Sequence, residues 1–267
     1  MIIDAHTHLD DVNLTGFSKE KRLEQLLKTM KKNKIDHALV LADIPSHPEE
    51  KMLSNEELLR LIEPHKQLHL VGKVPLSACQ NAAFLTQVRK HVEKGNMVGI
   101  KLYPGYELFY PNDQRYNNVY NICQEFDIPV MFHSGDVMYG GSLKHAQPLY
   151  IDEVASSRPK LKIIVCHMGN PWILDTAALT SKNENVYADM AGLFYKRLDP
   201  GMKMFLERKI EEFVHWNAHG EKLIFGTDWP ITDVGDTIKI IKDDKSLSSK
   251  DKKLIFGENT KKLFKIK

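Results

Sequence analysis

Two histidines one residue apart follow the first apolar run of the sequence, in the stretch MIIDAHTHLDD. If residues 2–6 form a strand, side chains alternate between its two faces, so His6 and His8 point to the same side. Further residues of ligating type close other apolar runs: His133, His167 and Asp228. Imidazole nitrogens and carboxylate oxygens are ligands that zinc and similar divalent ions prefer. The pattern therefore predicts a metal site with a position open for water.

The elements that would bring these residues together alternate along the chain. Short apolar runs predict strands at residues 1–6, 37–43, 68–74, 97–103, 128–133, 161–167, 185–191 and 222–228. Amphipathic segments between them predict helices, as over residues 18–33. About eight such units in a row predict an α/β fold, a (β/α)8 TIM barrel that forms a single domain over residues 1–267. The carboxyl ends of barrel strands share one rim, so the candidate ligands would face one opening.

An open, doubly wound parallel sheet is the alternative architecture for this pattern. A dinucleotide-binding sheet of that kind carries a glycine-rich loop after its first strand. Here that place holds AHTHLDD. The barrel is therefore the favoured fold.

Composition restricts the class of partner. The formal net charge is +2, from 37 Lys and Arg against 35 Asp and Glu, which gives no reason to expect nucleic acid. No apolar run approaches the ~20 residues of a membrane span, and the sequence does not open with a charged region followed by an apolar stretch, so no signal segment is expected. The widely spaced Cys79, Cys123 and Cys166 suggest reduced thiols rather than disulfides. We expect a cytoplasmic protein with a small-molecule substrate and no membrane partner, and the rim loops leave a homodimer open.

Several motifs carry a family resemblance. DAHTHLD, GIKLYPG, PVMFHSGD, IIVCHMGNPW, VYADMAG, LIFGTDWP and IFGENTKKLF occur in this order. Together they resemble the amidohydrolase superfamily of metal-dependent barrel enzymes, most of all its aminocarboxymuconate semialdehyde decarboxylase-like branch. The resemblance implies that His6, His8, His133 and Asp228 hold one divalent metal, zinc in the first place and manganese in the second. It also implies that His167 acts as an acid or base, or as a polarising group, beside the substrate.

Lys101, in GIKLY, occupies the place of the fourth-strand lysine that is carboxylated and bridges two ions in binuclear relatives. Three roles stay open for it: a carboxylated bridge, a contact to an anionic substrate, or an ammonium that reaches solvent. One metal is the default. Tyr103 shares a face with Lys101, and Tyr106 lies in the following loop. These three residues are the predicted substrate contacts, and the loops YPGYELFYPND and HSGDVMYGGSLKH are the predicted substrate walls.

Three aspartates have distinct expected roles. Asp228 is expected to act as a metal ligand and as the base that takes a proton from the attacking water. The alternative for Asp228 is that it caps the next helix, because TDWPI places Pro230 at a first-turn position. Asp4 and Asp189 would orient ligand histidines through the ring nitrogen that does not bind metal, and ordinary hydrogen bonding is the alternative for both.

Two activities use this set of residues. The first is hydrolysis of a small amide, ester or lactone, in which metal-activated water attacks the carbonyl, His167 helps to stabilise the oxyanion and Asp228 transfers the proton. The alternative is metal-dependent nonoxidative decarboxylation of a small unsaturated or aromatic carboxylic acid, in which His167 or Asp228 protonates the carbon that loses carbon dioxide. A metal-binding scaffold without catalysis is the third hypothesis.

Overall fold

Eight parallel strands form the centre of the protein, in a computed structural model that describes residues 1–11, 15–45, 50, 52–138, 140–195, 198–217 and 220–267. The strands are β1 (Ile3–Thr7), β2 (His37–Leu41), β3 (Leu68–Lys73), β4 (Met97–Leu102), β5 (Val130–Phe132), β6 (Ile163–Val165), β7 (Val186–Asp189) and β8 (Leu223–Ile224). Each strand pairs with the next in chain order. The chain after β8 returns to β1, because the amide of Ala5 donates to the carbonyl of Phe225 at 2.9 Å. The predicted barrel is confirmed, and the open doubly wound sheet is excluded.

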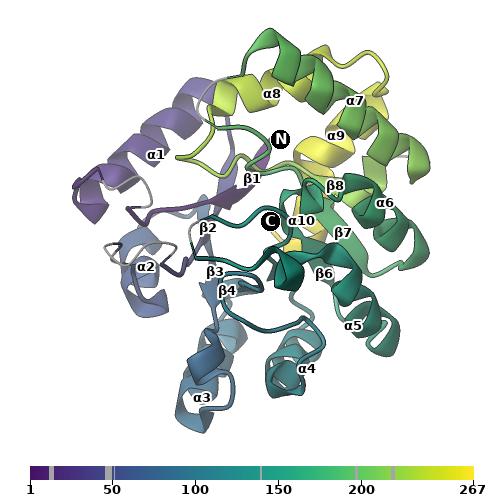
Figure 1. Cartoon of the computed structure of the whole chain (residues 1–267). Helices are drawn as coiled ribbons and strands as arrows, with labels where there is room; N and C mark the ends of the chain where they lie inside the picture. The colour runs from purple at the N-terminus through teal and green to yellow at the C-terminus, as the bar shows by residue number, and fades with distance from the viewer. Residues whose placement is uncertain (12–14, 46–49, 51, 139, 196–197, 218–219) are drawn as a thin grey trace.

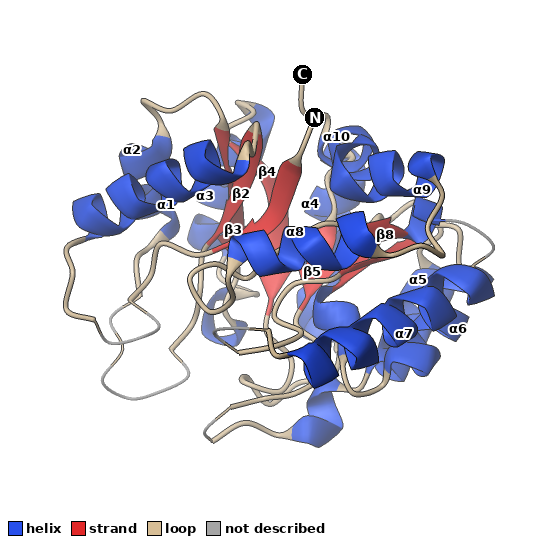
Figure 2. Cartoon of the chain, turned by 90° about the horizontal axis from the view of Figure 1, so that it is seen from above, coloured by secondary structure: helices blue, strands red, loops and turns tan. Residues whose placement is uncertain are grey.

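Helices follow the strands and cover the outside of the barrel (Figure 1). They are α1 (Lys19–Asn33), α2 (Asn55–Ile62), α3 (Ala82–Glu93), α4 (Asn117–Phe126), α5 (Ile151–Ser157), α6 (Ile173–Lys182), α7 (Pro200–Trp216), α8 (Val234–Asp243), α9 (Ser249–Lys253) and α10 (Asn259–Phe264). A π-helical turn, Leu254–Glu258, joins the last two. Figure 2 shows the strands in red inside this shell of blue helices. None of the helices in the described ranges is long and apolar enough to cross a membrane.

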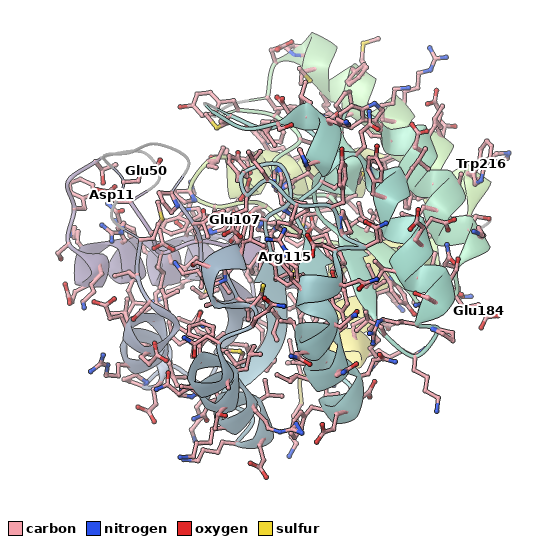
Figure 3. All side chains as sticks on the ribbon, turned by 60° about the horizontal axis from the view of Figure 1, so that its bottom comes forward. Asp11, Glu50, Glu107, Arg115, Glu184 and Trp216 are labelled. Atoms are coloured by element: carbon pink, nitrogen blue, oxygen red, sulfur yellow. The ribbon has the colours of Figure 1, made fainter. Side chains whose placement is uncertain are left out.

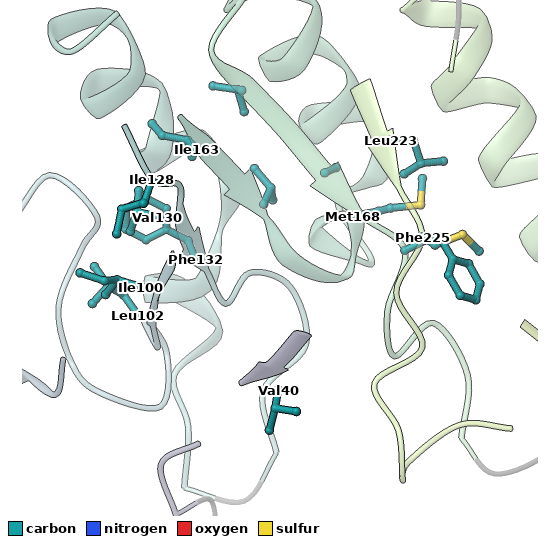
Figure 4. Packing of buried hydrophobic residues seen from close by; sticks show 14 of the residues in the cluster. Val40, Ile100, Leu102, Ile128, Val130, Phe132, Ile163, Met168, Leu223 and Phe225 are labelled. Atoms are coloured by element: carbon teal, nitrogen blue, oxygen red, sulfur yellow. The ribbon is translucent and has the colours of Figure 1, made fainter. Parts of the chain in front are cut away.

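The core has two parts because alternate strand residues point to opposite sides of the barrel wall. Leu39 and Leu41 of β2 lie in a buried cluster inside the barrel, whereas Val40 belongs to the cluster between the strands and the helices. Leu263 and Phe264 of α10 pack into the inner cluster. Figure 4 shows members of the outer cluster, among them Val40, Ile100, Val130, Phe132, Ile163 and Leu223. All three cysteines are buried and free, as expected of reduced thiols.

Two half-buried histidines meet at the amino ends of β2 and β3. Nδ1 of His37 lies 3.0 Å from Nε2 of His69, and their rings stack with centroids 5.2 Å apart. Burial lowers the pKa of His69 from 6.5 to about 4, and the neighbouring His37 acts in the same direction. The unfolded chain therefore takes up a proton at His69 below pH 6.5 while the folded chain does not. The buried, neutral ring of His69 therefore contributes fully to the free energy of unfolding above pH 6.5, and this contribution is lost as the pH falls towards 4.

We expect the substitution His69→Gln to make the protein less sensitive to acid. The free energy of unfolding of the wild type should fall by ~1 kcal/mol more than that of the variant between about pH 7 and pH 4.5, because the variant lacks this titrating ring. Urea unfolding at the two pH values measures the difference. His65→Gln, which removes a nearby half-buried histidine, is the matched control. Equal losses in the wild type and His69→Gln would contradict the prediction.

Candidate metal centre

Three predicted ligands converge at the carboxyl ends of β1 and β8. Nε2 of His8 lies 3.2 Å and Nε2 of His6 lies 3.6 Å from Oδ1 of Asp228. All three side chains are buried. Around a tetrahedral zinc with bonds of about 2.1 Å, neighbouring ligand atoms lie about 3.4 Å apart. Both distances to Asp228 are close to this value, and the ligand atoms of the three residues all lie within 4.8 Å of one another, so the group fits a divalent ion.

The ring of His6 is oriented by Asp189, the last residue of β7. Nδ1 of His6 lies 2.9 Å from Oδ2 of Asp189. Burial alone would raise the pKa of Asp189, but the adjacent ring of His6, which donates a hydrogen bond to it, holds that pKa well below its usual range. An ionised carboxylate only accepts hydrogen bonds, so Nδ1 of His6 carries the proton. Nε2 is thereby left without a hydrogen and faces Asp228, which is the arrangement expected of a ligand histidine.

Asp4 contacts backbone and a hydroxyl rather than an imidazole ring. Its carboxylate accepts hydrogen bonds from the amide of Thr227 at 3.0 Å, from the hydroxyl of Thr227 at 2.7 Å and from the amide of His6 at 3.3 Å. Burial raises the pKa of Asp4 to about 7, although the Thr227 bonds oppose this shift. Asp4 therefore links β1 to the residue before Asp228, and it acts on His6 through the backbone.

Asp228 has a left-handed backbone, with φ of 63°. Its amide donates to the carbonyl of His6 at 2.8 Å, which fixes the carboxylate over the two histidines. Burial raises its pKa, but the hydrogen bond from His8 and the neighbouring imidazoles outweigh burial and hold that pKa well below the usual range. The alternative that Asp228 caps the next helix is wrong, because the N-cap of α8 is Asp233, which accepts from the amide of Asp236.

His167 follows β6 and lies beside His6, with ring centroids 4.9 Å apart. Its Nδ1 lies 3.0 Å from the carbonyl oxygen of Ala191. A carbonyl only accepts, so Nδ1 carries the proton and Nε2 is left as an acceptor. Burial lowers the pKa of His167, which favours the neutral form of the ring. His6, His167 and Asp189 form a second group of closely spaced ligand atoms.

His133 reaches the same cluster but is held differently. Its ring centroid lies 4.9 Å from that of His167. Its Nε2 donates to the backbone carbonyl of Asp136 at 2.9 Å. Because Nε2 is used in this bond, Nδ1 is the nitrogen that His133 could offer to an ion. His133 is in neither of the two groups of closely spaced ligand atoms formed by described residues. Its role as a fourth ligand stays a prediction.

The three predicted substrate contacts lie at different depths. Lys101 is buried and its Nζ donates to Sγ of Cys166 at 2.8 Å, so the alternative of an ammonium in solvent is wrong. The hydroxyl of Tyr103, also buried, donates to the carbonyl of Ala42 at 2.6 Å. Tyr106 is half-buried, and its ring packs 4.8 Å from that of His133. Tyr106 alone of the three reaches beyond the buried layer, and contact with a substrate stays a prediction for each.

The walls around the cluster are fixed by polar contacts of their own. Glu107, in the predicted wall after β4, accepts the amide of Leu76 at 2.7 Å (Figure 3). Asp11, after β1, accepts the amide of Gly16 at 2.8 Å (Figure 3). Tyr139, in the other predicted wall, lies outside the described residues. The wall after β4 is therefore tied to the loop after β3.

Sequence reasoning missed Asp43. Its Oδ2 lies 3.3 Å from Nδ1 of His8. The signal was available, since Asp43 closes the apolar run HALVLAD in the same way that Asp228 closes LIFGTD. Sequence reasoning also missed Lys73, the last residue of β3. Its ammonium donates to the backbone carbonyl of Asp43.

The chain was compared with family profiles, curated proteins and solved structures, and it matches one family profile and several solved barrels. The amidohydrolase family profile matches residues 3–266, and no curated protein matches the chain. An uncharacterised TIM-barrel protein from Bordetella bronchiseptica is similar in structure, with a TM-score of 0.78 at 18% identity over 98% of this chain and 97% of that one.

Two further solved structures carry names of activities. A probable 2-pyrone-4,6-dicarboxylic acid hydrolase from Acinetobacter baumannii, with citric acid bound, has a TM-score of 0.70 at 16% identity over 99% of both chains. The 5-carboxyvanillate decarboxylase of Novosphingobium aromaticivorans, complexed with manganese and a nitrobenzoic acid, has a TM-score of 0.69 at 14% identity over 98% of this chain and 94% of that one. At these identities the likeness shows the shared fold.

Gly192 gives a direct test of the centre. It has φ of +63°, and a Cβ there would lie 2.6 Å from Oδ2 of Asp228 and 3.0 Å from Nδ1 of His167. We expect Gly192→Ala to displace the carboxylate and weaken zinc binding at least tenfold. Competition with a chelating dye measures the dissociation constant.

Gly95→Ala is the control for backbone strain. Gly95 has φ of +72°, and a Cβ added there would meet none of the described atoms within 4 Å, so the variant carries the strain without the crowding. It should lose about 1 kcal/mol of stability and keep its zinc affinity. Wild-type affinity in Gly192→Ala would show that the gap beside Asp228 is not required.

Proposed function

The chain belongs to the amidohydrolase family, and from that premise we propose that it is a metal-dependent hydrolase of a small amide, ester or lactone. The observation that carries the proposal is the convergence of Nε2 of His6, Nε2 of His8 and Oδ1 of Asp228. We propose one divalent ion, zinc in the first place and manganese in the second. A solved neighbour, the Novosphingobium decarboxylase, is complexed with manganese, which supports the second choice.

Each residue has a defined part in the proposed reaction. A divalent ion at this position supplies a Lewis acid that polarises a carbonyl and acidifies water. His6 and His8 would hold the ion through Nε2, since Asp189 occupies the other nitrogen of His6. The ionised carboxylate of Asp228 takes the proton from the attacking water and returns it to the leaving group. Nε2 of His167 accepts the other proton of that water, then donates a hydrogen bond to the developing oxyanion, and releases the proton to solvent with the carboxylate product.

The hydrogen bonds of the cluster support hydrolysis over decarboxylation. Hydrolysis begins with a group that accepts a proton, whereas decarboxylation ends with a group that delivers one to carbon. Nε2 of His167 has no hydrogen, because its Nδ1 donates to the carbonyl of Ala191. The carboxylate of Asp228 accepts from the ring of His8. Both groups are therefore acceptors.

Decarboxylation of a small unsaturated or aromatic acid is the second candidate. It is supported by the structural likeness to the 5-carboxyvanillate decarboxylase, which spans nearly the whole of both chains. The same residues would hold the ion and the substrate carboxylate. His167 or Asp228 would need to gain a proton before delivering it to the carbon that loses carbon dioxide.

Isotope labelling separates the two activities. We expect the zinc-loaded protein to hydrolyse members of a panel of small lactones, esters and amides in ¹⁸O water, with one ¹⁸O in the product carboxylate. Asp228→Asn should lower kcat by about 10²- to 10⁴-fold, since it removes the base. Release of carbon dioxide from carboxylic acids, with deuterium from D₂O at the product carbon, would instead establish the decarboxylase. An Asp228→Asn variant as active as the wild type would contradict both.

Metal content tests the ligand set itself. Protein purified without chelator should hold about one zinc or manganese per chain by elemental analysis, and His6→Ala should lose it because both its Nε2 and its link to Asp189 are removed. His133→Ala decides whether the fifth-strand histidine is a ligand. Two ions per chain would make Lys101 a carboxylated bridge. A metal-free protein after reconstitution would overturn the assignment.

A further inference from the structure

One imidazole nitrogen of the candidate metal centre lacks a hydrogen-bond partner. Nδ1 of His8 is buried and makes no hydrogen bond, and within the described ranges it is the only histidine nitrogen in that state. Leaving such a group unpaired away from water destabilises the folded protein. Oδ2 of Asp43 lies 3.3 Å away, close enough for an ion pair, although the contact does not have the geometry of a hydrogen bond. The carboxylate is therefore the group placed to satisfy this nitrogen.

Three contacts fix Asp43 in this position. Its Oδ1 accepts the amide of Ile44 at 2.8 Å. Its backbone carbonyl accepts from the ammonium of Lys73 on β3. The preceding carbonyl, that of Ala42, accepts from the hydroxyl of Tyr103 at 2.6 Å. Side chains from β3 and from the end of β4 thus hold the peptide after β2, and Oδ2 is the oxygen left to face His8.

Asp189 makes the corresponding contact to the other histidine of the pair. Its Oδ2 binds Nδ1 of His6 at 2.9 Å. In the barrel β2 lies beside β1 on one side, while β7 and β8 lie on the other. The two carboxylates therefore approach the His6 and His8 rings from opposite sides of β1. Carboxylates that accept from the far nitrogen of a ligand histidine fix its tautomer and raise its affinity for metal.

We propose that Asp43 is a positioning residue of the metal centre, which accepts the Nδ1 hydrogen of His8 and so commits Nε2 to the ion. Lys73 and Tyr103 act through it by holding the Ala42–Asp43 peptide. The inference rests on the proposed function, since it assumes that His8 binds the ion through Nε2. It gives Tyr103 a structural task inside the barrel that is separate from substrate contact.

Zinc affinity of the full chain tests the proposal. We expect Asp43→Ala to bind zinc about 10- to 100-fold more weakly than the wild type in competition with a chelating dye, and Asp43→Asn to fall between them because its amide oxygen still accepts a hydrogen bond. The visible absorption of the cobalt-loaded protein should change in the same order. Asp152→Asn is the matched control, since Asp152 bonds Lys182 and Asn183 and no imidazole, and it should keep wild-type affinity.

Unfolding of the metal-free proteins separates positioning from folding. Metal-free Asp43→Asn should unfold at the same urea concentration as the metal-free wild type, because a positioning role lowers zinc affinity without lowering stability. If Asp43→Ala does not fold, the nearly isosteric Asp43→Asn carries the decision. If Asp43→Asn and any folded Asp43→Ala bind zinc as tightly as the wild type, the positioning role of Asp43 is overturned and the proposed function still stands. A wild-type chain that binds no zinc overturns the proposed function and this inference with it.

Discussion

The hydrogen bond between Nδ1 of His6 and the carboxylate of Asp189 is the contact on which the candidate metal centre depends. It spans 2.9 Å between side chains that are 1% and 0% exposed. In that environment water cannot replace either partner, so the ring of His6 is fixed in one tautomer and one direction. The second oxygen of Asp189 accepts the amide of His167 at 2.8 Å. One buried carboxylate at the end of β7 thus sets the positions of two histidines from two other strands.

The charges of His6 and Asp228 suit a divalent cation, whereas His8 holds a proton that the cation must displace. Burial would lower the pKa of His8, but the carboxylates of Asp43 and Asp228 outweigh burial and raise it to about 9. Burial lowers the pKa of His6 to about 4, and the positive charge of Lys101 acts in the same direction. The imidazole is therefore neutral near neutral pH, while Asp228 stays ionised. A metal ion needs both conditions, because it displaces protons from its ligands when it binds. The buried carboxylates would be costly without a partner, so the imidazoles and the lysine stabilise the site before any ion arrives.

The fold and the outline of the site could be predicted from sequence because both depend on local patterns. Each strand is an apolar run, and ligating residues at the ends of such runs must share a rim once the strands are parallel. Asp43, by contrast, is significant only because β2 lies next to β1, which places its carboxylate beside His8. The partner of Lys101 is Cys166, which follows β6, and only the closed geometry reveals it. The helix cap at Asp233, rather than Asp228, depends on a loop conformation that residue types do not determine.

The spacing of His6 and His8 has its explanation in the residue between them. The hydroxyl of Thr7 donates to the carbonyl of Leu39 on β2 at 2.8 Å, so Thr7 is turned into the wall of the barrel. The register between β1 and β2 shifts between Asp4 and Thr7, and the amide of His8 then bonds the carbonyl of Trp229 at 2.8 Å. The chain at this point is held by β2 on one side and by the segment after β8 on the other. With Thr7 committed to the wall, the residues before and after it must both face Asp228. The threonine is therefore as much a part of the two-histidine motif as the imidazoles. Because its side chain points into the wall, the His6 and His8 side chains on either side of it both point to the same carboxylate oxygen of Asp228.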